Sequence, residues 1–330
     1  MSNRNRLYIR FVEFGGIRLI WAYIKMGVIW IGIKAVLRCI IKRRPIKEAY
    51  PVITDYVDKK LMKEFNPLLH RLVEEHKGHA LCESREDVPK IIWTCWLQGY
   101  EQAPSLVKVC IESQKKQFPE YEHRILTLNN YQEWVTLPKF IEEKYRKKRI
   151  PAALFSDLIR LAILKEYGGI WMDATVYCSG FENEKLRKRW QDIEQSNLTL
   201  FRFFRRKNEA PVGLSNWFIA AKPHHEVVDI ALEMLYAYWR TYNCTVDYFI
   251  MHLFLGMIFR TLPEAIANMP KENSYHSLML ASVLAQDYNE SWWEDVKAHV
   301  FIHKLNYRKE AEAAAVPNSF YRRIILGENI

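Results

Sequence analysis

The sequence of 330 residues contains little glycine and proline, 12 and 13 residues respectively, and six scattered cysteines with no C-x-x-C pair. The low glycine and proline content excludes collagen-like and low-complexity chains. The cysteine pattern does not indicate a disulfide framework, so we expect reduced thiols and a cytoplasmic protein. Hydrophobic residues make up 49% and charged residues 26% of the chain, which is typical of a globular protein with a large core.

Excess positive charge is almost absent outside the N-terminus. Residues 1–50 contain eleven basic and two acidic residues, whereas the rest of the chain contains 37 basic and 36 acidic residues. A nearly neutral body argues against nucleic acid as a partner. The net charge of +10 therefore belongs to the N-terminal segment.

This segment also lacks a long uncharged run. Between Ile17 and Ile41 the chain is apolar and aromatic but carries four basic residues, and its longest uncharged run, Met26 to Ile33, has eight residues. A membrane-spanning helix needs about 20 mainly apolar residues. We predict that residues 1–45 form helical structure lying on the anionic inner face of the plasma membrane. The alternative is a helix docked on the protein's own core or on a partner.

The remainder of the chain divides into two parts. Residues 46–87 are predicted to be a helical linker region with one helix over 53–75, and residues 88–330 to be a single domain in which strands and helices alternate. Strands are expected over 90–94, 121–126, 170–172, 198–203, 216–220 and 300–304, and helices over 105–118, 129–135, 138–149, 151–167, 226–242, 246–262 and 277–285. This alternation predicts an α/β fold with a mainly parallel sheet flanked by helices.

One window of the sequence carries candidate chemistry. The helix expected over 151–167 is apolar on nearly every side and therefore buried, yet it contains Asp157 and Arg160 on one face. A double glycine ends the helix, and the short strand that follows delivers Asp173 at its carboxyl end. Ligands of open α/β sheets bind at that end, so we predict that the three groups meet in one site. On an exposed helix, a plain surface ion pair would be the default interpretation of Asp157 and Arg160.

The same window resembles a known family. The run Ser156-Asp157-Leu158-Ile159-Arg160, followed by Tyr167-Gly168-Gly169-Ile170-Trp171-Met172-Asp173, resembles the S-D-x-x-R and Y-G-G-x-x-x-D signature of glycosyltransferases with the GT-A fold. It is similar in particular to capsular polysaccharide synthesis proteins related to glycosyltransferase family 32. Residues 88–99, Asp247 to Phe249 and His303 to Leu305 fit that family's other blocks, so the resemblance covers roughly residues 88–305.

The resemblance implies roles for individual residues. Catalytic roles fall on Asp157, Arg160 and Asp173, and contacts to a nucleotide-sugar donor on Trp93, Asp157, Arg160, Gly169 and Lys304. Trp93 would stack on the nucleotide base. Asp247 would serve the acceptor, although it can equally be a residue at a helix N-terminus without a catalytic role.

The sequence departs from the family at one position of the D-x-D motif. The motif reads Asp173-Ala174-Thr175, and a neutral hydroxyl is a weaker ligand for Mg²⁺ or Mn²⁺ than a carboxylate. Two alternatives follow. In one, the donor diphosphate, Asp173 and His303 coordinate the divalent cation. In the other, Lys304 carries part of the work of stabilising the charge on the leaving diphosphate.

The resemblance implies a bacterial glycosyltransferase of capsular or surface polysaccharide synthesis. It would transfer a sugar from a nucleotide sugar to a carbohydrate or polyprenyl-linked acceptor, with retention of the anomeric configuration. Two other functions stay open. One is a catalytically inactive sugar-binding subunit of the capsule machinery, motivated by Thr175. The other is a sugar-phosphate transferase, which would release a nucleoside monophosphate.

Overall fold

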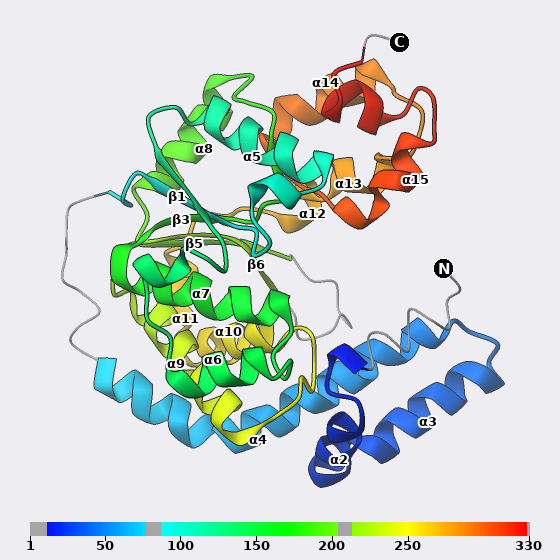
Figure 1. Cartoon of the computed structure of the whole chain (residues 1–330), viewed down its shortest axis with the longest axis vertical. Coiled ribbons are helices and arrows are strands. Elements are labelled where there is room, and N and C mark those ends of the chain that lie inside the picture. The colour runs from blue at the N-terminus through cyan, green and yellow to red at the C-terminus, as the bar shows by residue number, and fades with distance from the viewer. Residues whose placement is uncertain (1–11, 77–86, 204–212, 329–330) are drawn as a thin grey trace.

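The computed structural model describes residues 12–76, 87–203 and 213–328 (Figure 1). A five-stranded sheet lies at its centre, with helices on both faces and a helical extension at the N-terminus. In sheet order the strands are β2 (Glu122–Leu126), β1 (Ile91–Cys95), β3 (Gly169–Met172), β6 (Leu214–Ala221) and β5 (Leu198–Arg202). Strands β2, β1 and β3 pair in parallel, whereas β6 runs antiparallel to both of its neighbours. Four of these five strands thus share one direction, which confirms the predicted mainly parallel α/β fold.

The central strands are buried on both faces because apolar side chains alternate between two layers of helices. Trp93, Trp171 and Ile219 belong to one core cluster, and the neighbouring Ile92 and Ile170 belong to another. The first cluster lies against α4 (Tyr50–His76), α7 (Ala152–Tyr167), α9 (Glu226–Thr241) and α10 (Ile250–Thr261). Helices α5 (Ser105–Gln117) and α8 (Glu184–Glu194) lie on the opposite side of the sheet (Figure 1).

Smaller elements complete the fold. A second sheet pairs β4 (Val176–Cys178) with β7 (Ile302–Lys304) in antiparallel fashion. Outside the N-terminal segment, the other α-helices of the described residues are α6 (Lys139–Arg146), α11 (Pro263–Ala267), α12 (Ser274–Ser277), α13 (Met279–Val283), α14 (Glu290–His299) and α15 (Glu310–Ala314). The predicted strands and the long predicted helices are present, with ends shifted by a few residues. Elements β4, α8, α11, α14 and α15 were not predicted.

Helix α4 is part of the core, which the prediction of a linker over residues 46–87 did not anticipate. Its Val57, Leu61 and Leu69 are completely buried, and the helix packs on α9 and α10. An amphipathic helix that buries this much apolar surface stabilises the fold rather than merely connecting two parts of it. Residues 77–86 of the same predicted region lie outside the described residues.

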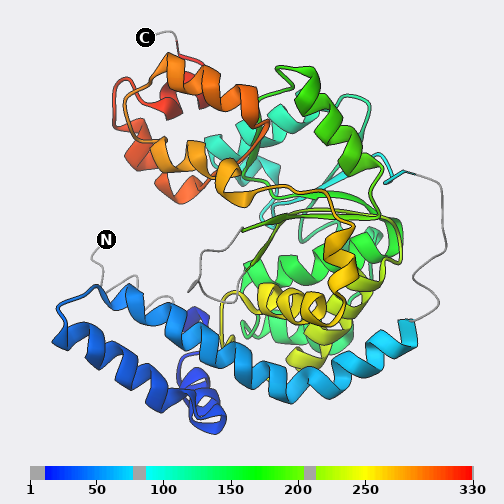
Figure 2. The same cartoon turned by 180° about the vertical axis from the view of Figure 1, so that it is seen from behind.

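The N-terminal segment forms a helical hairpin of α2 (Ile17–Met26) and α3 (Val28–Ile41), joined at Gly27 in a left-handed conformation. Helix α3 packs on α4, and the Tyr23 hydroxyl of α2 donates to the Val246 carbonyl at 2.8 Å. Figures 1 and 2 show the hairpin on the opposite side of the sheet from the C-terminal helices α12 to α15. No helix among the described residues is long and apolar enough to cross a membrane.

The double glycine after α7 is required by backbone packing. Gly169 has a φ of +94°, and a Cβ atom there would lie 2.7 Å from the Ile91 carbonyl oxygen of β1. A methyl group would therefore force β1 and β3 apart at the start of their pairing. We expect Gly169→Ala to lower the free energy of unfolding by about 1–3 kcal/mol. Urea denaturation would measure this loss, and an unchanged midpoint would show that the strands tolerate the added methyl group.

Candidate active site

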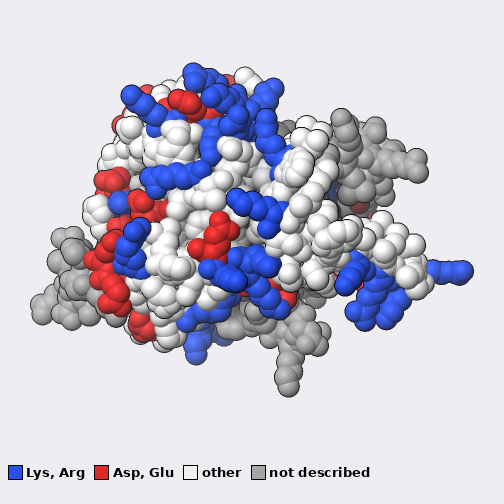
Figure 3. All heavy atoms as spheres, turned by 90° about the horizontal axis from the view of Figure 1, so that it is seen from below, with Lys and Arg blue, Asp and Glu red and all other residues white. Residues whose placement is uncertain are grey.

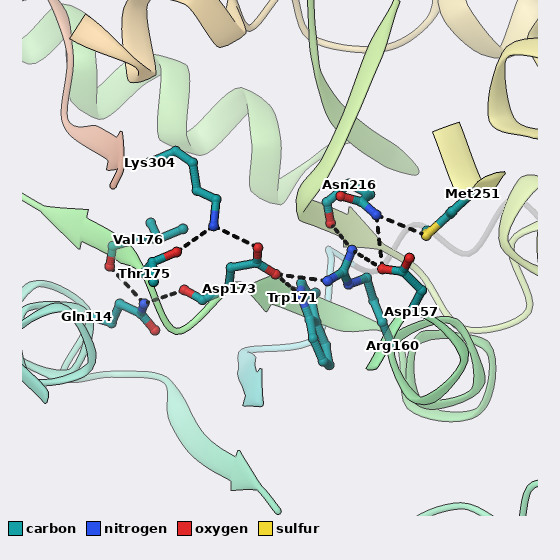
Figure 4. Close-up of polar contacts among 10 residues, drawn as sticks. All are labelled: Gln114, Asp157, Arg160, Trp171, Asp173, Thr175, Val176, Asn216, Met251 and Lys304. Carbon is teal, nitrogen blue, oxygen red and sulfur yellow. Dashed lines mark hydrogen bonds and ion pairs between the residues drawn. The ribbon is translucent and has the colours of Figure 1, made fainter. Parts of the chain in front are cut away.

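Three charged side chains meet beside the carboxyl end of β3, as the sequence predicts (Figure 4). Asp157 and Arg160 come from the same face of α7, and Asp173 is the first residue after β3. Arg160 Nη1 lies 3.0 Å from Asp157 Oδ1, and Nη2 donates to Asp173 Oδ1 at 2.9 Å. One guanidinium thus joins the two carboxylates. The surface ion pair considered from the sequence is excluded, because the Arg160 side chain is only 5% exposed.

Further contacts fix the guanidinium in place. Nη1 also donates to the Asn216 carbonyl of β6 at 2.6 Å, and the group lies over the Trp171 ring, 4.7 Å from its centre. The Asn216 amide donates to Asp157 Oδ1 at 3.0 Å, so β6 holds both members of the α7 pair. Both terminal nitrogens of Arg160 are therefore bound by the protein, whereas its buried Nε has no hydrogen-bond partner among the described residues. This arrangement suits a positioning residue better than the implied contact with the donor.

A second cation approaches Asp173 from the far end of the chain. Lys304 of β7 donates to Asp173 Oδ2 at 2.9 Å and to the Thr175 hydroxyl (Figure 4). The Lys304 and Asp173 side chains are 21% and 24% exposed, so a ligand can reach them. Lys304 and Asp173, which the resemblance assigned to donor binding and catalysis, thus lie in direct contact.

The turn that carries Asp173 is held by a buried amide that the sequence analysis missed. The Gln114 amide of α5 donates to the carbonyls of Asp173, at 3.2 Å, and Val176, at 2.9 Å. Its side-chain oxygen accepts a hydrogen bond from the Thr94 hydroxyl of β1 at 2.9 Å. Because a buried amide with three partners has little freedom, α5 and β1 together fix the main chain of the D-x-D segment.

The environment drives the two carboxyl pKa values apart. Burial raises the pKa of Asp157 to about 6, although Arg160 opposes the shift. Burial also acts on Asp173, but Lys304 and Arg160 outweigh it and hold the pKa of that carboxyl below its usual value. Asp173 therefore remains ionised throughout the physiological range, whereas Asp157 begins to take up a proton in mildly acidic solution.

Helix α10 adds an imidazole to this environment. Burial, followed by the charge of Arg160, lowers the pKa of His252 to about 3, so the ring stays neutral. Its Nδ1 is buried and has no hydrogen-bond partner among the described residues. His252 could not be predicted from the sequence, because a single histidine in an apolar helix carries no motif.

Trp93 does not fit the role that the resemblance implies, and Gly169 has a structural explanation. Trp93 is completely buried, donates through Nε1 to the Gly168 carbonyl at 2.9 Å, and meets the Trp134 ring edge-on at 5.2 Å. It therefore has no open ring face on which a nucleotide base can stack. Gly169 is also buried and is explained by the packing of β3 on β1, so its contact with a donor remains a prediction.

Asp247 and His303 are likewise held within the protein. The Asp247 carboxylate accepts hydrogen bonds from the Thr54 hydroxyl at 2.7 Å and from the Phe249 amide at 2.8 Å, just before α10 begins. This geometry favours the alternative of a helix N-terminal residue. His303 is fully buried, and its ring lies 3.0 Å from the Ser179 hydroxyl and 5.2 Å, centre to centre, from the Trp293 ring. In the described part of the chain it makes no hydrogen bond or ion pair with Asp173.

The residues at the D-x-D segment do not fit a divalent cation. Asp173 supplies the carboxylate of this segment, and both of its oxygens already accept hydrogen bonds from cationic groups. The predicted second protein ligand, His303, belongs to a buried aromatic cluster instead. Within the described ranges, no three His, Cys, Asp or Glu side chains come together as a metal site.

The fold and the site define an α/β protein with a charged cluster at the carboxyl end of a parallel strand, where such folds bind ligands. Residues 38–324 match the family model described as capsular polysaccharide synthesis protein, and the chain belongs to that family. The match begins well before residue 88, where the resemblance seen in the sequence begins, and so includes the whole of α4. Family membership confirms the resemblance.

Individual proteins are also similar to this chain. A protein of Acanthamoeba polyphaga mimivirus, named an uncharacterized glycosyltransferase, is 29% identical over 157 residues, which is 45% of this chain and 56% of that relative. The chain thus spans little more than half of that relative's length. The solved structure named PaToxG Glycosyltransferase is 16% identical, with a TM-score of 0.38, covering 65% of this chain and 83% of that one.

Proposed function

We propose that this chain is a retaining glycosyltransferase of capsular polysaccharide synthesis, which moves a sugar from a nucleotide-sugar donor to a carbohydrate or lipid-linked acceptor. The observation that carries the proposal is the cluster of Asp157, Arg160, Asp173 and Lys304 beside the carboxyl end of β3. Membership of the capsular polysaccharide synthesis family supports the substrate class.

The proposed roles follow from the contacts. Asp157, fixed by Arg160 and Asn216, accepts hydrogen bonds from hydroxyls of the donor sugar. Asp173 orients the Lys304 ammonium toward the donor diphosphate. Arg160 fixes the positions of the Asp157 and Asp173 carboxylates relative to each other. An ammonium beside the leaving group stabilises the negative charge that develops as the bond from sugar to phosphate breaks.

The released nucleotide tests this function against its alternatives. The purified chain is incubated with UDP-, GDP-, ADP- and dTDP-sugars and a panel of saccharide and polyprenyl-phosphate acceptors. A glycosyltransferase releases a nucleoside diphosphate and forms a glycosylated acceptor. Release of a monophosphate would identify a sugar-phosphate transferase, and binding without turnover across the panel would identify a sugar-binding subunit.

The N-terminal hairpin supports a peripheral position at the anionic inner leaflet. The side chains of Trp21 and Trp30 are 66% and 68% exposed, and the two helices also expose a set of aliphatic residues, namely Ile17, Ile20, Ile24, Ile33, Leu37, Ile40 and Ile41. Arg18, Lys25, Lys34 and Arg38 lie on the same two helices. Figure 3, which views the molecule from below, shows basic side chains in blue and uncharged residues in white over much of that face. Aromatic side chains among basic ones suit the headgroup layer.

The hairpin also reaches the region of the site. The Tyr23 hydroxyl donates a hydrogen bond to the Val246 carbonyl. The ring of Phe14, which precedes α2, stacks on the Tyr248 ring with 6.2 Å between ring centres. Tyr248 in turn lies close enough to Asp157 and Asp173 that their charges, after burial, raise its pKa. A hairpin lying on the bilayer would thus hold the loop before α10 and the adjoining site near a lipid-linked acceptor.

Membrane binding depends on the exposed tryptophans in this proposal. We expect the double variant Trp21→Ser, Trp30→Ser to float with vesicles containing anionic lipid at least tenfold less than the unaltered chain, because it loses its two large interfacial side chains. The variant should unfold at the same urea concentration, since both residues are exposed. Equal flotation of the two proteins would refute the proposed membrane surface.

A further inference from the structure

Lys304 of β7 occupies a fixed position beside the D-x-D segment. The β4–β7 ladder pairs Lys304 with Val176, and the Leu305 amide donates to the Thr175 carbonyl at 2.9 Å. These main-chain contacts hold the backbone of Lys304 and Leu305 against the backbone of Thr175 and Val176. Thr175, the residue that departs from the D-x-D pattern, provides the second acceptor for this ammonium.

The charges around Asp173 oppose a divalent cation at this position. Oδ1 accepts from Arg160 Nη2 and from Trp171 Nε1, both at 2.9 Å, and Oδ2 accepts from Lys304. A metal ion bound to this carboxylate would lie close to two positive groups. A carboxylate at position 175 would offset that repulsion, but the hydroxyl present there is neutral.

The ammonium keeps a donor for a ligand. Lys304 carries three N–H groups, and its contacts with Asp173 and Thr175 engage two of them among the described residues. Its side chain is 21% exposed. A phosphate oxygen can therefore take up the third N–H without displacing either protein partner.

We infer that Lys304 takes the place of the divalent cation, so that this chain binds the donor diphosphate and transfers the sugar without a metal ion. The inference rests on the proposed function. As the bond from the anomeric carbon to the phosphate oxygen breaks, its electron pair stays on the diphosphate, where the ammonium stabilises it. The anomeric carbon forms its new bond with the acceptor oxygen, and the acceptor proton passes to the diphosphate.

Nucleotide binding by the full chain tests the inference. Isothermal titration with UDP, GDP, ADP and dTDP is carried out once in EDTA and once in Mn²⁺. We expect at least one diphosphate to bind with affinities that agree within about twofold in the two conditions. Binding that requires Mn²⁺ would overturn the inference and leave the proposed glycosyltransferase standing. Binding of no diphosphate in either condition would overturn both.

Two variants test whether the Lys304 ammonium is the cause of diphosphate binding without metal. Lys304→Met should weaken diphosphate binding in EDTA by about tenfold to a hundredfold, the loss of one charge-assisted hydrogen bond. Adding Thr175→Asp to Lys304→Met rebuilds the D-x-D pair, and Mn²⁺ should then strengthen binding at least tenfold. The control Lys271→Met removes an exposed lysine from the loop before α12 and should bind as the unaltered chain does. Unchanged binding by Lys304→Met in EDTA would overturn the inference.

Discussion

Replacement of Asp173 by asparagine is expected to lower the rate of sugar transfer by about a thousandfold or more. The side chain keeps its size but loses the charge that both Arg160 and Lys304 contact. Lys304 then lacks its anionic partner, and the ammonium is no longer held toward the leaving group. Loss of preorganised charge at a reacting centre costs about 10²–10³ in rate, and here it affects two cationic groups at once.

The rate should be measured with saturating donor, by the release of nucleoside diphosphate. Asp192→Asn is the matched control, because this residue pairs with Lys188 on the exposed surface of α8, and its activity should stay within about twofold. Far-ultraviolet circular dichroism of both variants establishes that the chain remains folded. More than a tenth of the original activity in Asp173→Asn would contradict the central role of this carboxylate.

The parts of the site predictable from sequence are those set by local spacing. Asp157 and Arg160 share a face because they are three residues apart in a helix, and the double glycine turns the chain directly into the strand that ends at Asp173. The apolar surroundings also indicated that the pair was buried. Helix and strand periodicity are therefore sufficient to predict that these three side chains lie at one edge of the sheet.

The contacts that the sequence did not predict join distant segments, although the resemblance already assigned Lys304 to donor binding. Lys304 meets Thr175 across 129 positions, and Gln114 reaches Val176 across 62. No periodicity marks such partners, since each is fixed by how a helix or a second strand packs on the turn. The structure does not support the predicted stacking of Trp93 on a nucleotide base, for a related reason. A central strand covered on both faces is apolar throughout, so its sequence does not reveal whether an aromatic ring faces a ligand or the core.

The largest effect on stability is expected from Arg160→Met. The substitution leaves the carboxylates of Asp157 and Asp173 without the guanidinium that joins them, while a linear apolar side chain fills much of the same space. Removing one partner of a buried ion pair typically costs about 3–5 kcal/mol, because the remaining charge stays desolvated. Urea denaturation at pH 7.5 should show a loss of this size. Arg187→Met, which removes an exposed arginine of α8, should change stability by less than about 0.5 kcal/mol.

The loss of stability caused by Arg160→Met should become smaller as the pH falls. In the unaltered protein the pKa of Asp157 is raised from 3.8 to about 6, so its proton favours the folded state, and this contribution is lost as the pH rises from about 4 to 6. Without Arg160 the same pKa rises further, because the attraction that opposed burial is gone. Protonation then removes the buried charge in mildly acidic solution, and the destabilisation by Arg160→Met should be smaller at pH 5 than at pH 7.5. An equal loss at both values would mean that packing against Trp171, and not charge, is the main contribution of Arg160.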